Sequence, residues 1–486
     1  MTSLLVWLAL ASQDWSQLQG GPGRTGYTDA SVPFDRKKHG GPLVFTPEWE
    51  WEKPCEMSPL VQPIVHRGLA LAGDYDGVLH AIDVATGRTA WTYRTGGLIY
   101  HTASADGELV FTGSQDGALH AVDLAGKPRW TFQTGRGIVS SPCVLDGAVF
   151  VTSKDGHLYA LDAARGALRW QFPRKGDRAL DPILSSPSAG GGLVTFGDES
   201  MTAWGLDARD GTLRWKTRLR GQSFMYFWPV LGEKTGIVVY RTAPVLDFHA
   251  NLNAFDAWLE RRTGLKRKEH EEARKADPDW TEHHRGDVQK EQEAIREYLR
   301  DHPAEQTCFV LDLGTGQERY LPPVAYTGGA GSTPAPPVLD DARGRGWMVF
   351  RTAYSVSDGG YMVRGYTDVG EWDPATGFIR QITKTKEGWE TYHLIGDELV
   401  LLSANRDLLF LNSWPNNGAV SLDTHDSFNV CRDREVAHLR EKLWVSNAGT
   451  AGGNGGGHGD ATLVTAEGRI LWQSARFIRA SRGAGK

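Results

Sequence analysis

The stretch Asp76-Gly-Val-Leu-His-Ala-Ile-Asp83-Val-Ala-Thr-Gly87-Arg-Thr-Ala-Trp91 decides the fold, because the chain repeats it. The pattern returns at residues 116–130 and 155–170 and, in weaker form, at residues 204–215. The tryptophans that end these copies lie 39, 40 and 45 residues apart. A repeat of this length indicates one supersecondary unit that stacks on copies of itself.

Each copy predicts four short strands, which we name A to D. In the second copy they cover residues 99–105, 108–113, 118–123 and 129–132. Asp-Gly pairs separate the first three strands, and Asp-Gly is a strong hairpin signal because these turns need positive φ. The Asp that ends strand C is expected to cap the next turn. The Trp on strand D is expected to pack over the neighbouring sheet and set the spacing between units.

Weaker copies continue through the second half of the chain. Residues 310–316 and 371–377 repeat the end of strand C, Leu408–Asn412 is read as a degenerate strand C, and residues 463–472 are read as strands C and D. Pro47-Glu-Trp49-Glu-Trp51 adds a ninth candidate for strand D. We therefore predict an all-β, eight-bladed β-propeller of four-stranded antiparallel blades over residues 13–486. The surplus strand would close the ring and remove the exposed edges, and either terminus could supply it.

Residues 248–306 interrupt the fifth blade. Apolar residues recur there at helical spacing, first at Leu252 and Leu259 and later at Val288, Ile295 and Leu299. Residues 261–301 hold 11 basic and 11 acidic residues, and such a balance is typical of a solvated helical surface. We predict two or three amphipathic helices. A partner-binding arm, or a cover over one propeller face, is the alternative interpretation.

The termini and the charge indicate where the protein works. The apolar run up to Ala11 and Ser12 resembles a signal peptide, although it lacks basic residues, so residues 1–12 are predicted to be one and the protein to be exported. A first strand is the alternative. No other stretch reaches 18 apolar residues, so no transmembrane segment is expected. The net charge of -6 argues against a nucleic-acid partner.

The four cysteines are Cys55, Cys143, Cys308 and Cys431, and none forms a C-x-x-C pair. The repeat places three of them in different units. Buried free thiols are therefore the expected state, and a disulfide between Cys55 and Cys431 is the alternative.

The repeat also predicts where a ligand would bind. In a propeller, the D-to-A connections and the B-to-C turns lie on one face, around the mouth of the central channel. Most strand A starts read Ser-Pro or Thr-Pro, but three carry bulky or titratable side chains, and three strand B ends carry arginine. The predicted site residues are Tyr100, His101, Tyr226, Trp228, Arg241, Arg351, Tyr392, His393 and Arg406.

We expect these residues to form a pocket for an anionic or aromatic ligand, because arginine pairs with carboxylates and phosphates. The alternative is that they pair with carboxylates on the loops. The sequence holds no G-x-S-x-G, H-E-x-x-H or C-x-x-C-H motif, so no catalytic or metal-binding residue is predicted. The glycine-rich run at residues 452–460 is predicted to be a B-to-C loop, with His458 and Asp460 as metal ligands the alternative. His80 and His120 recur at one repeat position and are assigned to strand packing.

The Ala-x-Asp-x-x-Thr-Gly-x-x-x-Trp pattern resembles the PQQ-like (quinoprotein-type) propeller repeat, and Asp14-Trp15-Ser-Gln-Leu-Gln-Gly-Gly is similar to the opening segment of many exported members. The resemblance implies either a quinone-dependent dehydrogenase or a non-catalytic scaffold, such as the propeller subunit of the outer-membrane β-barrel assembly machinery. For a quinone-dependent alcohol dehydrogenase it would imply, in many members, an adjacent Cys-Cys pair, and a Ca²⁺ held by Glu, Asn and Asp. The chain has no such pair and no matching Asn-Asp segment, so neither PQQ nor Ca²⁺ is predicted.

We therefore expect an exported, periplasmic or envelope scaffold, a monomer that binds an envelope protein or a small ligand at the channel mouth without catalysis. A divergent PQQ-dependent oxidoreductase that uses the same mouth is the first alternative. A carbohydrate-binding propeller, which rests only on the Trp and Tyr residues near the channel, is the second.

Overall fold

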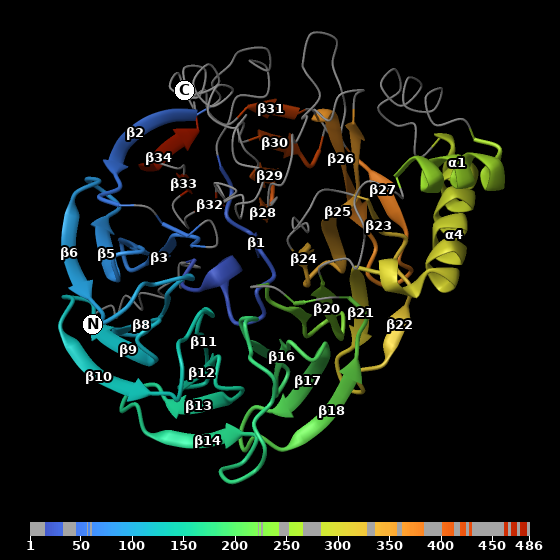
Figure 1. Cartoon of the computed structure of the whole chain (residues 1–486). Coiled ribbons are helices and arrows are strands. Elements are labelled where there is room, and N and C mark those ends of the chain that lie inside the picture. The colour runs from blue at the N-terminus through green and yellow to red at the C-terminus, as the bar shows by residue number, and fades with distance from the viewer. Residues whose placement is uncertain are drawn as a thin grey trace, which may run out of the picture.

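Eight antiparallel sheets stand around one axis in the computed structural model (Figure 1). The eight-bladed, all-β architecture predicted from the repeat is therefore confirmed. The structure describes residues 15–32, 45–55, 57–58, 61–221, 223–224, 227–242, 252–265, 283–327, 336–356, 362–382, 401–412, 418–423, 427–429, 461–464, 468–473 and 477–483.

The blades are numbered here in chain order, and their strands are given from the channel outward. Blades 1 and 2 contain β3 (Ile64–His66), β4 (Leu69–Gly73), β5 (Val78–Asp83) and β6 (Thr89–Arg94), then β7 (Ser104–Asp106), β8 (Leu109–Gly113), β9 (Ala118–Asp123) and β10 (Pro128–Gln133). Blades 3 and 4 contain β11 (Cys143–Leu145), β12 (Ala148–Thr152), β13 (Leu158–Asp162) and β14 (Leu168–Phe172), then β15 (Ser188–Gly190), β16 (Leu193–Asp198), β17 (Thr202–Asp207) and β18 (Leu213–Arg218).

The second half of the ring is less regular. Blades 5 and 6 contain β19 (Val230–Gly232), β20 (Ile237–Arg241), β21 (Cys308–Asp312) and β22 (Glu318–Tyr320), then β24 (Val338–Asp340), β25 (Arg345–Val356), β26 (Met362–Trp372) and β27 (Ile379–Gln381), with β23 (Ala325–Thr327) parallel to β25. Blades 7 and 8 contain β28 (Leu401–Asn405), β29 (Leu408–Asn412), β30 (Gly418–Ser421) and β31 (Ser427–Asn429), then β32 (Ala461–Val464), β33 (Arg469–Gln473), β34 (Phe477–Gly483) and β2 (Phe45–Glu52).

The glycine and the tryptophan of the repeat meet between blades, not within one. The Trp91 ring on β6 of blade 1 lies against Gly126 of blade 2, and Trp91 Nε1 donates to Leu124 O at 2.8 Å. The same contact recurs around the ring as Trp49 over Gly87, Trp130 over Gly166, Trp170 over Gly211, Trp215 over Gly316 and Tyr320 over Gly377. Because the apolar clusters also join neighbouring blades, the core is a series of layers between sheets.

The last two blades correct the register predicted from the sequence. Leu408–Asn412 is β29, the second strand of blade 7 and not the third. Residues 463–472 run through the two innermost strands of blade 8, β32 and β33, where strands C and D were expected. β24, β28 and β32 contact one another in order around the channel, which fixes β28 and β32 as innermost. These units lack the Asp-Gly turns, and an alternating apolar run does not say which strand of a blade it forms.

The N-terminal part of the chain closes the ring. β2 pairs with β34 in antiparallel fashion and forms the outer strand of blade 8. Trp49 Nε1 then donates to Val84 O at 2.8 Å, and Trp51 Nε1 donates to Thr89 Oγ1 at 2.9 Å, both in blade 1. The predicted surplus strand is thus the N-terminal one, and it joins the last blade to the first.

Residues 15–28 line the central channel, a role that the sequence did not predict. Backbone N–H groups on the innermost strands of successive blades donate to carbonyl oxygens of this segment, from Val65 N to Trp15 O (2.9 Å) around to Ala404 N to Gly26 O (2.8 Å). β1 (Tyr27–Thr28) then pairs in parallel with β28 at the centre of the ring (Figure 1). The segment therefore satisfies backbone groups that face the channel.

The described helices of the insertion in blade 5 lie outside the ring, beside blade 6 (Figure 1). They are α1 (Leu252–Thr263), α4 (Arg285–Asp301) and the short 3₁₀ helix η3 (Pro303–Glu305). Gln292 on α4 donates to Ile379 O at 2.6 Å and accepts from Ile379 N at 3.2 Å, so its amide pairs with the outer strand of blade 6 as another strand would. Within the described residues the helices pack against the rim and do not cover the channel mouth.

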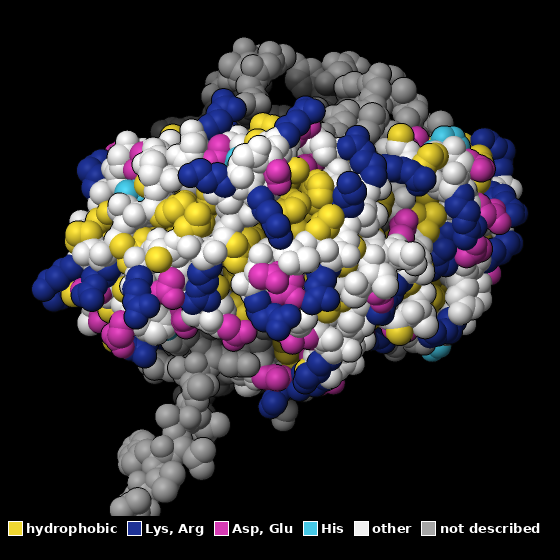
Figure 2. All heavy atoms as spheres, turned by 90° about the horizontal axis from the view of Figure 1, so that it is seen from below, with side chains coloured by type: hydrophobic (Ala, Val, Ile, Leu, Met, Phe, Trp, Pro, Cys, Tyr) yellow, Lys and Arg dark blue, Asp and Glu magenta, His cyan; other side chains and the backbone are white. Residues whose placement is uncertain are grey.

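The rim of the ring carries basic and acidic side chains interspersed, with apolar patches between them (Figure 2). Leu168 and Leu213, on the outer strands of blades 3 and 4, are 46% and 43% exposed. Cys55, Cys143 and Cys308 carry free thiols, so the alternative disulfide through Cys55 is not formed. No helix in the described part of the chain is long and apolar enough to cross a membrane.

Candidate binding site at the channel mouth

Three of the predicted site residues lie together at the mouth of the channel. Trp228 precedes β19, and Arg241 ends β20. Val230 pairs with Val239 in this antiparallel ladder, so Trp228 and Arg241, each two residues beyond that pair, lie at the same end of the two strands. The rings of His101 and Trp228 meet edge to face, with centroids 6.2 Å apart. The site therefore joins the start of blade 2 to both inner strands of blade 5.

Arg241 is buried without a full set of acceptors. Its side chain is only 2% exposed and reaches blade 6, where Nη2 donates to Val349 O at 2.9 Å. Its Nε and Nη1 have no hydrogen-bond partner, and neither has Trp228 Nε1. The hydroxyls of Thr242, which follows β20, and of Thr307, which precedes β21, are buried and unpaired as well. Most of the unpaired groups are N–H donors, so the cluster is suited to an acceptor-rich ligand.

A second buried arginine lies deeper in the channel. Arg24 is fully buried, and it donates from Nε to Pro187 O at 2.7 Å and from Nη2 to Ser141 O at 3.0 Å and Pro142 O at 2.9 Å. Burial lowers the pKa of Arg24 to about 10, so it stays protonated at neutral pH. These acceptors are backbone carbonyls at the starts of the innermost strands. Arg24 is therefore the hydrogen-bond donor for the repeated Ser-Pro segments of blades 3 and 4.

His101 connects the Trp228 side of the mouth with the hydrogen bonds around Arg24. Its Nδ1 accepts hydrogen bonds from the Ser141 hydroxyl at 2.7 Å and from Thr102 N at 2.9 Å. Ser141 O in turn accepts from Arg24. No carboxylate in the described part of the chain contacts Arg24 or Arg241, so their positive charge has no neutralising partner there. Within the described ranges, no loop carboxylate pairs with Arg241.

One acidic residue near the mouth was missed in the sequence. Glu199 follows β16 in the B-to-C turn of blade 4, and its Oε1 is buried without a hydrogen-bond partner. Desolvation raises the pKa of its carboxyl above the ordinary value, although Ser223 and Phe224 N oppose this by hydrogen bonding. Its signal in the sequence was the turn Asp198-Glu199-Ser200, which departs from the Asp-Gly turns of the earlier blades.

The remaining predicted site residues are not brought to this cluster. Arg406 lies in the turn between β28 and β29, the two innermost strands of blade 7, which places it on the face opposite the mouth near Asp29. That prediction was wrong because the register of blade 7 was shifted by one strand. The backbone of Arg351 lies within β25, well before the end of that strand. Tyr100 is half-buried and lies 6.2 Å from the Tyr75 ring. Tyr226, Tyr392 and His393 lie outside the described residues.

The described part of the mouth shows no cluster of metal-binding side chains. No group of three or more His, Cys, Asp or Glu side chains in the described ranges is placed to hold a metal ion. His80 Nε2 bonds to Asp74 at 2.6 Å and His120 Nε2 to Asp116 at 2.9 Å, so each imidazole is held by a carboxylate of its own blade. The glycine-rich run at residues 452–460 lies outside the described residues. Trp228, buried edge-on to His101, offers a sugar no exposed ring face.

Comparisons with known proteins agree with the repeat. The family model described as outer membrane protein assembly factor BamB matches residues 75–225. Quinohemoprotein alcohol dehydrogenase from Comamonas testosteroni is similar with a TM-score of 0.59 and 13% identity, over 98% of this chain and 81% of that one. A europium-containing methanol dehydrogenase has a TM-score of 0.58 and 12% identity, over 95% and 89%.

BamB from Moraxella catarrhalis aligns with a TM-score of 0.49 and 13% identity, over 91% of this chain and 99% of that one. No curated protein sequence matches the chain. At these identities the solved structures show the fold alone. The resemblance to the PQQ-like repeat, inferred from the residues, is confirmed by the family model over blades 1 to 4.

Proposed function

We propose that this chain, whose repeats and fold are those of the PQQ-like propellers, is a non-catalytic scaffold of the cell envelope that binds an anionic group at the channel mouth. The observation that carries the proposal is the pair Arg241 and Trp228, buried with N–H donors that have no acceptor. A family model described as an outer membrane protein assembly factor supports an envelope role.

The physical reason is the free energy of unpaired buried donors. Each costs about 1–3 kcal/mol when it is left without a partner, and more when it is charged. A carboxylate or phosphate that enters the mouth would give acceptors to Arg241 and Trp228 and would neutralise charge that none of the described side chains neutralises. A neutral or cationic group would do neither. The ligand is therefore an anion, presented either by a small molecule or by a side chain of an envelope protein.

Replacing Arg241 tests this proposal. Arg241→Met keeps most of the buried volume but removes the donors, so the variant should keep the melting temperature of the wild type or exceed it. Citrate, succinate and inorganic phosphate should raise the Tm of the wild type more than that of the variant, because ligand binding stabilises only a folded state that can bind. Comparing the two proteins at equal salt removes the general effect of the anion. A large loss of Tm in the variant without any anion would show that Arg241 is structural.

Export is tested separately. Expression with and without residues 1–12, followed by fractionation of the cell envelope and mass spectrometry of the mature N-terminus, should find the full chain in the periplasm, cleaved near Ala11 or Ser12. A full-length product that stays in the cytoplasm with residues 1–12 intact would contradict this part of the proposal.

Glu199 favours a second candidate function, a divergent quinone-dependent oxidoreductase. A carboxyl with a raised pKa near a channel mouth is what a general acid or base requires. Adding PQQ and Ca²⁺ to the pure protein and following cofactor absorbance and dye reduction would decide this. Dye reduction that the Glu199→Gln substitution abolishes would support the oxidoreductase. If no cofactor binds, the non-catalytic scaffold remains the proposed function.

A further inference from the structure

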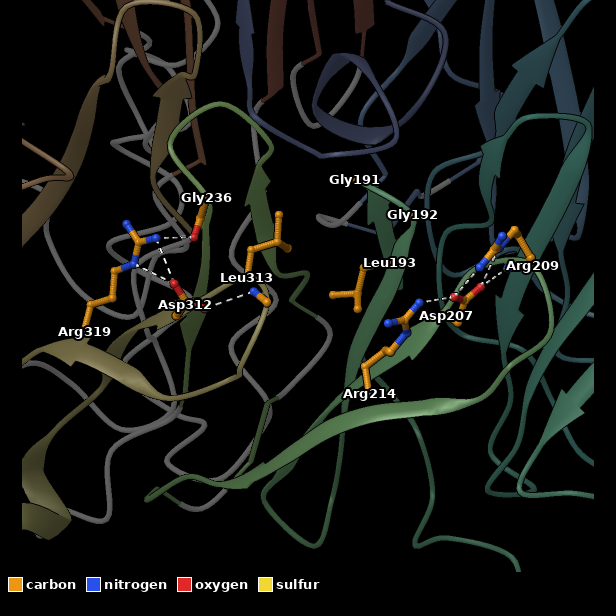
Figure 3. A pocket seen from close by; sticks show the side chains of 11 residues that line it. Gly191, Gly192, Leu193, Asp207, Arg209, Arg214, Gly236, Asp312, Leu313 and Arg319 are labelled. Carbon is orange, nitrogen blue, oxygen red and sulfur yellow. Dashed lines mark hydrogen bonds and ion pairs between the residues drawn. The ribbon is translucent and has the colours of Figure 1, made fainter.

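A hollow of about 530 Å³ lies between blades 4 and 5, on the face opposite the channel mouth. The A-to-B and C-to-D turns of both blades surround it, and these turns lie at the far ends of the strands from the B-to-C turns. Leu193 of blade 4 and Leu313 of blade 5 lie between its two walls (Figure 3). It therefore has an apolar middle that is separate from the channel.

The blade 4 wall carries an excess of positive charge. The buried carboxylate of Asp207 accepts from Arg209 Nε and Nη2, both at 3.2 Å, and also pairs with Arg214 Nη2 at 2.5 Å (Figure 3). Two guanidinium groups thus share one carboxylate. Their side chains are 83% and 54% exposed, so both remain open to a partner.

The blade 5 wall is neutral and its donors are used. Arg319 pairs with Asp312 at 2.9 Å, and its Nη1 and Nη2 also donate to the backbone oxygens of Thr235 and Gly236. Among the residues that line the hollow, the available positive charge is therefore on Arg209 and Arg214, although Asp210 lies beside Arg209 and Glu233 beside Gly191. The hollow therefore has a cationic wall on blade 4, an apolar middle, and a polar wall on blade 5 whose hydrogen-bond donors are already paired.

The turn of blade 4 explains why a hollow exists at this boundary. Its A-to-B turn is Gly191-Gly192, where the corresponding turns of blades 1 and 3 are Arg67-Gly68 and Asp146-Gly147. A Cβ at Gly191 would stand 3.3 Å from Leu313 Cδ2, so a side chain there would enter the hollow. The hollow is thus left open by the absence of a side chain that blades 1 and 3 carry at this turn position.

We propose that this hollow binds an acidic peptide segment of a partner protein. A carboxylate of the segment pairs with Arg209 and Arg214, and an apolar side chain beside it packs on Leu193 and Leu313. An extended peptide is the occupant that matches, because side chains along it alternate in direction and two of them can reach the charged wall and the apolar middle. The inference concerns a different face from the mouth and does not rest on the anion proposed there.

The test uses the full chain and two fluorescein-labelled peptides of equal length, one of alternating Glu and Leu and one of alternating Lys and Leu. The Glu-Leu peptide should bind with saturation and more weakly as salt increases, because exposed charges are screened. The Lys-Leu peptide should not bind. No saturable binding of the Glu-Leu peptide, or equal binding of both peptides, would overturn the proposal.

Gly191→Asp fills the hollow and adds a negative charge, so it should weaken binding of the Glu-Leu peptide at least about tenfold. Gly107→Asp is its matched control, since Gly107 lies in the A-to-B turn of blade 2 with φ +56, against φ +58 at Gly191, and nothing lies within 4 Å of its added Cβ. The control should bind as the wild type does. Arg214→Gln should also weaken binding and reduce its salt dependence.

Arg241→Met separates this proposal from the one about the mouth. The variant should bind the Glu-Leu peptide unchanged. If Arg241→Met abolishes peptide binding and Gly191→Asp does not, the peptide occupies the mouth. The hollow is then not its site, while the proposed anion site stands.

Discussion

Gly126 shows what the repeated glycine does, and it gives a direct test. Its φ is +77, and an added Cβ would lie 2.7 Å from the Trp91 ring of the preceding blade. Gly126→Ala should therefore lower the free energy of unfolding by about 2 kcal/mol or more, through left-handed backbone strain and overpacking. Urea unfolding measures the change. Gly107→Ala, with φ +56 and open space around the new Cβ, should cost only the backbone part.

The two buried arginines should behave in opposite ways. Arg24→Met removes donors from backbone oxygens of Leu18, Ser141, Pro142 and Pro187, which would be left buried and unpaired. The free energy of unfolding should therefore fall by about 3 kcal/mol or more. Arg241→Met removes one such bond and should cost little. Equal losses in urea unfolding would show that both arginines are structural.

At the residue scale, the sequence predicted the mouth in part. His101, Trp228 and Arg241 departed from the small residues of the repeat, and the structure brings them together. Arg406 was misplaced because Asn405-Arg406-Asp407 resembles a turn between strands B and C, while tertiary packing makes it the turn between A and B. Arg24 carried no signal, since only the path of residues 15–28 through the channel gives it a role.

The turns that end strand C determine how the protein responds to acid. Arg209 and Arg214 hold the pKa of Asp207 well below its usual range, and a Thr86 side chain and backbone N–H lower the pKa of Asp83 in the same turn of blade 1. A depressed carboxyl pKa adds stability that is complete above the unfolded value of about 3.9 and is lost as pH falls toward the folded value. Thermal unfolding should therefore show a falling Tm below about pH 4.

Asp207→Asn isolates one of these turns. The variant should be less stable than the wild type at pH 7 and should approach it as the pH falls below the unfolded pKa, because the wild-type carboxyl then protonates. A constant difference in Tm across the acid range would show that hydrogen bonds to the side chain, and not its charge, stabilise the turn.

Helix α4 protects one blade edge. Gln292 Oε1 accepts from Ile379 N on β27, so Gln292→Ala should speed hydrogen exchange of the Ile379 amide while leaving the inner strands of blade 6 protected. Gln289→Ala, an exposed position on the same helix, is the matched control and should change nothing. Unchanged exchange at Ile379 in both variants would mean that the helix does not cap the strand.

At the element scale the sequence was most informative where turns were marked. In blade 2, the Asp-Gly pairs and the final Trp placed strands B, C and D within one residue of β8, β9 and β10, whereas strand A was predicted to begin five residues before β7. The apolar spacing at Val288, Ile295 and Leu299 also predicted a helix, and it is α4. The face on which that helix docks was not predictable, because its partner Ile379 lies in another blade.

The channel segment affects the whole ring. A chain that begins at residue 45 keeps β2 but lacks residues 15–28, whose carbonyls accept N–H bonds from inner strands of six blades. We expect a lower melting temperature and faster hydrogen exchange at Val65, Ala105 and Ala189. A chain that begins at residue 13 is the control. Equal hydrogen exchange in the two proteins would show that residues 15–28 do not protect the inner strands.

The pairing of β2 with β34 also determines when the ring can close during synthesis of the chain. The ribosome makes Phe45–Glu52 long before Phe477–Gly483, the segment with which it pairs. Throughout synthesis, and through any passage across a membrane that begins at the N-terminus, the first-made strand has no partner. The ring therefore closes only once β34 has been made, and until then β2 is an open edge that can pair with other chains.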